Sequence, residues 1–255
     1  MIIAEIGLNH FGRHFIAEEF ITQLVETDVD AITLQIREAS FHKNPPTLEH
    51  IWDTLDYEHY EKFIKLIHEG GKQFGMAVYE KEDIEFFADL GVDFFKVLSM
   101  HFMDDRVVEL FEATDVPIYL STGMVSMEDI RGRLEGDLEK YVKDGRLRLI
   151  HTQLSHDVAD TNLLAIPALQ ELGVPVAYGN HLENPITVYA ALMLNVSDIF
   201  FYVHNGHNSS PDFKHAINLW GDVGRFTHAI NLIEAAKGDG KKEGMPNKLL
   251  EDEEE

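Results

Sequence analysis

An acidic residue near the start of the chain stands where a carboxylate is costly. Glu5 interrupts the apolar run from Ile2 to Ile6, which has the pattern of a buried strand. An unpaired charge in a protein interior is unfavourable, so such a carboxylate must be paired, protonated or bound to a metal. Glu5 is therefore predicted either to belong to a functional site or to anchor a structural hydrogen-bond network.

Polar and titratable residues recur at the ends of other apolar segments. They are Asn9 and His10, Gln35 and Arg37, Lys96, Ser99 and His101, Ser121 and Thr122, His151, Gln153 and His156, Asn180 and His181, and His204, Asn205 and His207. One such residue alone is more often a hydrogen-bonded loop residue than a ligand. Convergence of many on one face predicts a pocket, because a polar cavity is expensive to hold for stability alone.

The elements that must position these residues alternate along the chain. Strands are predicted at 2–6, 31–35, 75–79, 92–99, 116–121, 146–152, 174–178 and 198–203, and helices at 15–26, 57–71, 83–90, 104–114, from 126, 162–172, 185–194 and 214–236. This alternation predicts an α/β fold, a single-domain (β/α)8 TIM barrel whose working face lies at the C-terminal ends of the strands. Six residues are expected to converge on that mouth: Glu5, Lys96, Ser121, His151, His181 and His204.

The composition limits the possible partners and ligands. The chain has 255 residues, no cysteine and 14 histidines, so a metal must be held by His, Asp or Glu. A formal charge of −24 argues against nucleic acid or anionic membranes as partners. No apolar run reaches 18 residues and no leader precedes the first strand, which predicts a cytoplasmic protein. Residues 1–237 are expected to form the barrel and 238–255 an acidic, flexible tail. The segment 37–52 is predicted to be a long loop of the kind that often serves as a lid.

Several segments, in the same order, resemble the sialic acid synthase family. The opening strand Ile3-Ala4-Glu5-Ile6-Gly7, followed by Asn9, His10 and Gly12, is similar to the first strand of that family. Further similar segments are Lys96 with Ser99, Ser121-Thr122-Gly123-Met124, Asn162-Leu163 and Pro211-Asp212-Phe213-Lys214. The resemblance spans Ile2 to about Ile217, and the ordered set is more specific than any single motif.

The resemblance implies an activity and a set of site residues. Family members condense phosphoenolpyruvate with an N-acylated amino sugar, using a divalent metal held by two histidines to activate the open-chain aldehyde. By this likeness Glu5 and His181 are the expected catalytic residues, and His181 with His204 the metal ligands, for manganese, magnesium, zinc or cobalt. The expected substrate-binding residues are Asn9, Gln35, Lys96, Ser99, Ser121, Thr122, His156 and Asp212. A homodimer is a further expectation.

The chain departs from the family pattern at several positions. Thr33 stands where the family has a lysine, Met76-Ala77 where it has Ser-Thr, and Leu154 and His156 where it has an Asn and a Tyr. A gapless alignment puts Tyr202 at the second metal ligand, with His204 two residues farther and, by strand alternation, on the same side. The C-terminal antifreeze-like domain of many relatives has no counterpart after Lys237.

Three functions remain open at the level of sequence. The first is a metal-dependent synthase that joins phosphoenolpyruvate to an amino sugar or related aldose, giving a sialic-acid-like nonulosonic acid. The second keeps the metal without phosphoenolpyruvate, as a sugar lyase, isomerase or hydrolase, and the histidines His101, His156 and His207 favour it. The third is a non-catalytic relative that binds a sugar or a partner protein. Metal content separates the third from the others, and phosphate release separates the first two.

Overall fold

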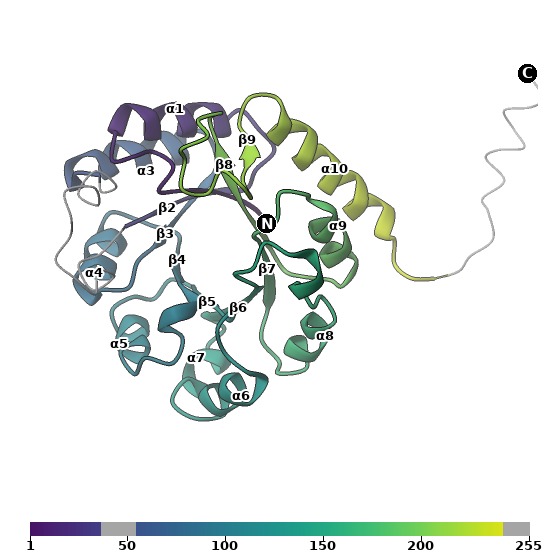
Figure 1. Ribbon diagram of the computed structural model, residues 1–255. Coiled ribbons are helices and arrows are strands. Elements are labelled where there is room, and N and C mark those ends of the chain that lie inside the picture. The colour runs from purple at the N-terminus through teal and green to yellow at the C-terminus, as the bar shows by residue number, and fades with distance from the viewer. Residues whose placement is uncertain (37–54, 242–255) are drawn as a thin grey trace, which may run out of the picture.

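The computed structural model describes residues 1–36 and 55–241 and shows a closed barrel of parallel strands surrounded by helices (Figure 1). The barrel strands are β1 (Ile2–Gly7), β2 (Ala31–Gln35), β3 (Gln73–Ala77), β4 (Phe94–Val97), β5 (Ile118–Ser121), β6 (Leu147–Thr152), β7 (Val176–Asn180) and β8 (Ile199–His204). Neighbours in sequence pair in parallel, and β1 also pairs with β8, with Glu5 opposite Tyr202. The predicted (β/α)8 TIM barrel is confirmed.

Helices follow the strands and cover the outside of the barrel (Figure 1). They are α1 (His14–Leu24), α3 (Tyr60–Glu69), α4 (Lys81–Asp89), α5 (Val107–Glu112), α6 (Met127–Glu135), α7 (Glu139–Lys143), α8 (Ala165–Gln170), α9 (Ile186–Met193) and α10 (Asp222–Lys237), with short 3-10 helices η2 (Tyr57–His59), η3 (Ser99–His101) and η4 (Val158–Asp160). The predicted helix start at Ser126 is a capping box with Asp129. Within the described part of the chain, no helix is long and apolar enough to cross a membrane.

Strand alternation divides the core into two clusters. The larger lies between strands and helices, and the smaller fills the barrel interior with Ile3, Ala31, Phe94, Tyr119, Ile150, Ala177 and Phe200. Side chains two positions farther along each strand point to the same side. The next layer therefore consists of Glu5, Thr33, Lys96, Ser121, Thr152, Gly179 and Tyr202. The barrel interior is therefore apolar in one layer and mostly polar in the next layer, two residues closer to the C-terminal ends of the strands.

Glycines allow close packing at two points in this interior. A Cβ at Gly75 would lie 2.3 Å from the Phe94 ring, so β3 leaves its interior space to that aromatic side chain. Gly7 ends β1 with a φ of +55°, and the pairing of β1 with β2 shifts register between Glu5 and Gly7. Such a bulge turns the chain out of the strand, which begins the polar loop at Leu8 and Asn9.

The last predicted helix begins later than expected. The pattern from Lys214 to Ala236 predicted one helix, but α10 starts at Asp222 and a short strand, β9 (Ile217–Asn218), precedes it. β9 pairs in parallel with the end of β8, with Val203 opposite Ile217. Gly221 separates β9 from α10. Its φ of +89° is a conformation that residues other than glycine rarely adopt. The predicted loop at 37–52, with Arg37, and the tail beyond residue 241 lie outside the described residues.

Candidate active site

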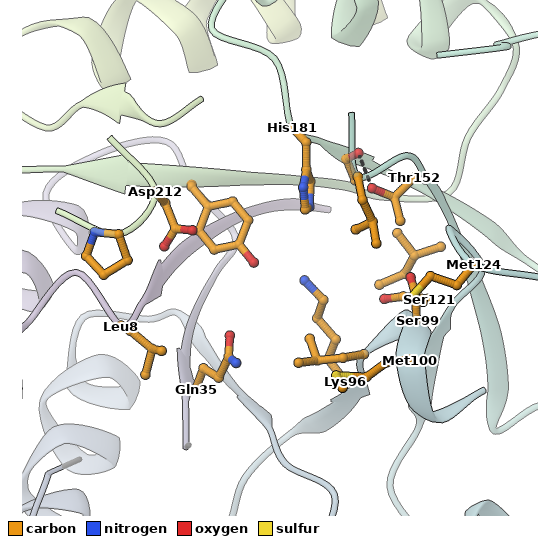
Figure 2. A pocket seen from close by; sticks show the side chains of 16 residues that line it. Leu8, Gln35, Lys96, Ser99, Met100, Ser121, Met124, Thr152, His181 and Asp212 are labelled. Atoms are coloured by element: carbon orange, nitrogen blue, oxygen red, sulfur yellow. Dashed lines mark hydrogen bonds between the residues drawn. The ribbon is translucent and has the colours of Figure 1, made fainter. Parts of the chain in front are cut away.

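A cavity of about 400 Å³ opens at the C-terminal ends of the barrel strands (Figure 2). It is lined by Leu8, Gln35, Lys96, Leu98, Ser99, Met100, Ser121, Met124, Ile150, Thr152, Leu154, Gly179, His181, Tyr202, Pro211 and Asp212. These residues come from most of the strands and from the loop after β8. Of the predicted site residues, the structure brings six to this lining: Gln35, Lys96, Ser99, Ser121, His181 and Asp212.

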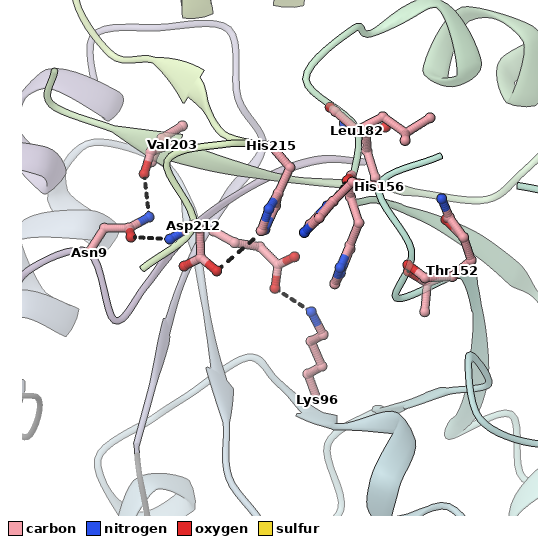
Figure 3. A network of polar contacts seen from close by, with 12 residues as sticks. Asn9, Lys96, Thr152, His156, Leu182, Val203, Asp212 and His215 are labelled. Atoms are coloured by element: carbon pink, nitrogen blue, oxygen red, sulfur yellow. Dashed lines mark hydrogen bonds and ion pairs between the residues drawn. The ribbon is translucent and has the colours of Figure 1, made fainter. Parts of the chain in front are cut away.

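Glu5 and Lys96 form a buried ion pair at the base of the cavity. The Lys96 Nζ donates to Glu5 Oε1, and both side chains are more than nine-tenths buried (Figure 3). The Nζ also lies 5.6 Å from the centroid of the Tyr202 ring, where the aromatic face favours a cation. Among the described residues, Lys96 is the only Lys or Arg that lines the cavity. The buried carboxylate of Glu5 is thus paired with the ammonium group of Lys96 on β4.

Hydroxyl groups from η3 and β5 also line the cavity that Lys96 lines. Ser99 and Ser121 line it, and the Ser99 Oγ accepts a hydrogen bond from the Gly123 N–H at 3.0 Å. Thr122, predicted to bind substrate, instead donates through Oγ1 to the Ile150 carbonyl at 3.0 Å and is buried. Thr122 therefore ties β5 to β6, while the two serines face the cavity.

Asn9 holds the loop after β8 rather than lining the cavity. Its Nδ2 donates to the Val203 carbonyl at 2.8 Å, and its Oδ1 accepts from the Asp212 N–H at 3.1 Å (Figure 3). Asn9 is fully buried, so both bonds form away from water. The side chain predicted as a substrate contact thus fixes the backbone of Asp212, whose carboxylate lines the cavity.

His181 points into the cavity from the end of β7 (Figure 2). Burial, followed by the charge of Lys96 and by His215 and His156, lowers the pKa of His181 to about 3. The ring is therefore neutral near pH 7 and keeps a nitrogen lone pair for a metal or a hydrogen bond. Its part in metal binding and catalysis stays a prediction.

His204 does not join His181 at this cavity. Its Nδ1 accepts from the Gly206 N–H at 2.9 Å, and its ring packs against Phe213 with centroids 4.6 Å apart. It lines a different cavity beside α9 and α10. At this end β8 pairs with β9, with His204 opposite Asn218, and strand alternation alone did not predict that pairing. The predicted pair of His181 and His204 at the cavity is corrected accordingly.

His151 also faces away from the cavity. Its Nε2 lies 2.9 Å from the Thr161 carbonyl, and its ring lies 6.3 Å from Tyr178, which belongs to the core between strands and helices. Ile150 and Thr152, on either side, line the cavity. The expectation that His151 converges on the mouth with Lys96 is therefore wrong, because it has the opposite strand parity.

His215, which the sequence analysis did not single out, stands among the site residues. Its ring is parallel to that of His181, with centroids 5.1 Å apart and an interplanar angle of 4°. The ring of His156 also stacks on that of His215, with centroids 5.0 Å apart. The His156 Nδ1 lies 2.9 Å from the His181 carbonyl oxygen (Figure 3). His156 itself is exposed at the rim. The only sequence signal for His215 was its position directly after the Pro211–Lys214 segment.

Asp212 lies close to the edge of this histidine cluster. The His215 Nε2 is 3.3 Å from Asp212 Oδ1, within the range of an ion pair (Figure 3). Tyr202 packs edge-on against both His181 and His215, with ring centroids 5.6 and 5.1 Å away. Burial, with Glu5 and Asp212 nearby, raises the pKa of Tyr202, so its phenol remains protonated. The uncharged His181 and Tyr202 side chains and the carboxylates of Glu5 and Asp212 thus lie near one cation, Lys96, in this part of the barrel mouth.

A separate group of possible metal ligands lies on the surface. Asp56, Glu58 and His59 are the only three His, Asp or Glu side chains among the described residues whose ligand atoms all lie within 4.8 Å of one another. The two acidic residues are exposed, and none of the three lines the central cavity. Exposed acidic groups of this kind are common without any bound ion.

The chain matches a family model and several characterised proteins. The model of the NeuB family matches residues 21–242. N-acetylneuraminate-9-phosphate synthase of Homo sapiens is 25% identical over 96% of this chain and 73% of its own length. N,N'-diacetyllegionaminic acid synthase of Legionella pneumophila is 24% identical over 97% of this chain and 76% of its own length.

Solved structures show the same fold. N-acetylneuraminic acid (sialic acid) synthetase from Leptospira borgpetersenii superposes with a TM-score of 0.86 at 20% sequence identity, covering 99% of this chain and 90% of that one. The agreement in fold extends over the strands, whose C-terminal ends surround the cavity.

Proposed function

Because this chain belongs to the NeuB family, we propose that it condenses phosphoenolpyruvate with an N-acylated amino sugar or a related aldose to a sialic-acid-like nonulosonic acid. The family assignment makes it an enzyme and favours catalysis over a purely binding role. In the proposed reaction, C3 of phosphoenolpyruvate bonds to the aldehyde carbon of the sugar. Water adds at C2, and inorganic phosphate leaves.

One observation carries this proposal: a buried lysine, Lys96, shares the lining of the cavity with two hydroxyl groups. Ser99 and Ser121 line the cavity with it. An ammonium and hydroxyl donors in the same cavity suit a carboxylate or phosphate, because hydrogen bonds to charged acceptors are the stronger kind. Low exposure of Lys96 strengthens that attraction.

Glu5 and Asp212 supply the acidic groups. Glu5 holds the Lys96 ammonium in place. In the proposed reaction its carboxylate would orient a water or the sugar acceptor. Asp212, on the loop after β8, lines the cavity across from Ser99 and Ser121 (Figure 2). There it can accept hydrogen bonds from sugar hydroxyl groups. Gln35, at the end of β2, adds an amide to the same lining.

The family likeness implies a divalent metal, and His181 fits that role. Its imidazole is neutral and faces the cavity, which is the form in which histidine binds manganese, zinc or cobalt. A metal bound there would polarise the aldehyde oxygen of the sugar. Lys96, Ser99 and Ser121 would meanwhile hold the other substrate by charge and hydrogen bonds.

The test is phosphate release that depends on both substrates. Purified protein is incubated with phosphoenolpyruvate, N-acetylmannosamine or a panel of related amino sugars, and each divalent metal in turn. Sugar-dependent phosphate release with a product of the mass of the joined carbon skeletons is expected. Lys96→Met should lower the rate by at least about 100-fold, the loss of roughly 3 kcal/mol of transition-state stabilisation. No release with any sugar and metal would contradict the proposal.

A second function is favoured by the charge of the cavity. Lys96 is its only Lys or Arg among the described residues and is already paired with Glu5, while the buried Thr33 opposite Glu5 is uncharged. One paired cation is a modest counterpart for a phosphate and a carboxylate together. A sugar lyase, isomerase or hydrolase that does not use phosphoenolpyruvate fits this balance. Turnover of an amino sugar or nonulosonic acid without phosphoenolpyruvate would identify it.

A further inference from the structure

Asp212 reaches the cavity from a loop, and different residues hold its backbone and its side chain. Asn9 Oδ1 accepts a hydrogen bond from the Asp212 N–H at 3.1 Å, which fixes the main chain (Figure 3). The carboxylate lies beyond two side-chain torsions that this bond does not restrain. Among the described residues, His215 makes the only ion pair or hydrogen bond with this carboxylate, at 3.3 Å between Nε2 and Oδ1. The direction of the carboxylate therefore depends on His215.

A tight turn places the two side chains next to each other. The His215 N–H donates to the Asp212 carbonyl at 3.0 Å, so residues 212–215 close on themselves. The His215 Nε2 lies within ion-pair range of Oδ1 but lacks the alignment of a hydrogen bond. With its proton on Nε2, the imidazole attracts the carboxylate at that angle too, and the burial of the ring limits screening by water.

The ring of His215 is itself held in place by three aromatic neighbours. It is parallel to the ring of His181, with centroids 5.1 Å apart, and it stacks on the ring of His156 with centroids 5.0 Å apart. Tyr202 packs edge-on against it at 5.1 Å, with an interplanar angle of 88°. A ring packed in this way has little room to change its rotamer. His215 thus gives Asp212 a partner in a fixed position.

Packing alone does not favour a histidine at this position. His215 is 8% exposed, and its Nδ1 has no hydrogen-bond partner among the described residues. A phenylalanine would keep a ring in the same contacts without burying a nitrogen that has lost its hydration. His215 does not line the cavity either, so its nitrogens are not placed to bind the ligand directly. What histidine alone supplies here is the Nε2 beside Asp212.

We propose that His215 is a positioning residue that holds the Asp212 carboxylate toward the sugar acceptor. It acts through Asp212 and does not touch the substrate. The inference rests on the proposed function for the identity of the ligand, whereas the contact between the two side chains stands without it. It gives a role to a loop residue that neither strand alternation nor the family resemblance selects.

The first measurement needs no substrate. Crystal structures of the wild-type chain, His215→Phe and His215→Gln are compared for the direction of the Asp212 side chain. Phenylalanine keeps a ring and removes both nitrogens, whereas glutamine keeps an N–H donor and removes the ring. The carboxylate is expected to leave its wild-type direction in His215→Phe and to keep it in His215→Gln. An unchanged Asp212 side chain in His215→Phe would overturn the proposal.

The second measurement is a double-mutant cycle on the KM for the amino sugar. His215→Phe is expected to raise that KM by about 5- to 30-fold and the KM for phosphoenolpyruvate by less than about twofold, since Asp212 lies on the sugar side of the cavity. In an Asp212→Asn background the same substitution should change the KM for the sugar by less than about twofold, because no carboxylate remains to be positioned. His215→Gln should recover most of the affinity for the sugar.

A matched control replaces a histidine far from this contact. His228 is exposed on α10, and His228→Phe should leave both KM values at those of wild type. Circular dichroism melts confirm that each variant is folded. His215→Leu, which also removes both nitrogens, takes the place of His215→Phe if the phenylalanine variant does not fold.

The outcomes separate this inference from the proposed reaction. An equal rise in both KM values, or a rise for the sugar that is as large in the Asp212→Asn background, would show a general packing role and overturn the inference. A wild-type chain that releases no phosphate would contradict the proposed function. The direction of Asp212 in the crystal structures then decides the inference alone.

Discussion

At the scale of single residues, the Glu5–Lys96 pair joins the stability of the barrel to its function. Both side chains are buried, so removing one partner leaves a charge in the interior without compensation. Lys96→Met should lower the free energy of unfolding by about 3–5 kcal/mol, measured by urea denaturation. The double variant Glu5→Gln with Lys96→Met removes both charges and should recover much of that loss. Equal stability of the single and double variants would show that the charge is not the cause.

His10 makes the stability depend on pH. It is fully buried, its Nδ1 accepts from the Gly12 N–H, and burial lowers its pKa to about 4. Its folded pKa lies below the unfolded value of about 6.5, so between these values the unfolded chain binds more protons. Its contribution is present above pH 6.5 and lost as the pH falls toward 4, by up to about 3 kcal/mol.

Urea denaturation at pH 7 and pH 4.5 tests this, with His10→Gln as the comparison. The variant should lose less stability than wild type over the same interval, because glutamine does not titrate. Parallel curves for the two proteins would assign the acid sensitivity to other groups. His204 and His151, whose pKa values burial also lowers, provide the background that both proteins share.

At the scale of elements, Asn9 connects the loop after β1 to the loop after β8. Asn9→Ala would leave the Val203 carbonyl and the Asp212 N–H without their partners in the interior. A loss of about 1–3 kcal/mol in unfolding free energy is expected for such groups. Asn9→Asp keeps an acceptor for the Asp212 N–H but loses the donor to Val203.

The same variants test whether Asn9 positions Asp212 for the substrate. Asn9→Ala should raise the KM for the amino sugar more than that for phosphoenolpyruvate, because Asp212 faces the sugar side of the cavity in the proposed reaction. Asn9→Asp should show a smaller change in that ratio. A uniform fall in kcat with unchanged KM values would point to a general loss of structure instead.

The elements themselves followed from the sequence more readily than the directions of the site residues. Alternating apolar segments required a parallel sheet, and eight of them required closure, so Lys96, Ser121 and His181 were correctly brought to one mouth. Side chains alternate along β6, so the inward position of Ile150 places His151 outward. The sequence alone did not show which of the two faces inward. His215 lies on a loop, where no periodicity relates a residue number to a direction, and β9 was too short to show in the pattern.

At the scale of the whole molecule, charge opposes the approach of an anionic substrate. The formal net charge is −24, and Lys96 is the only Lys or Arg that lines the cavity among the described residues. A large net charge creates a long-range potential that slows encounter with a ligand of the same sign. Salt shortens the range of that potential, from about 30 Å at 0.01 M to about 8 Å at 0.15 M.

The value of kcat/KM for phosphoenolpyruvate should therefore rise severalfold between 0.01 and 0.15 M ionic strength, about the size expected when a like-charge field is screened. The uncharged amino sugar provides the matched control within the same assay, since the kcat/KM for a neutral ligand has no long-range term to screen. Steady-state kinetics in sodium chloride, repeated in potassium chloride to exclude specific ion effects, measure both. If kcat/KM for phosphoenolpyruvate instead falls with salt, local attraction to Lys96 outweighs the acidic surface, and the cavity controls substrate capture.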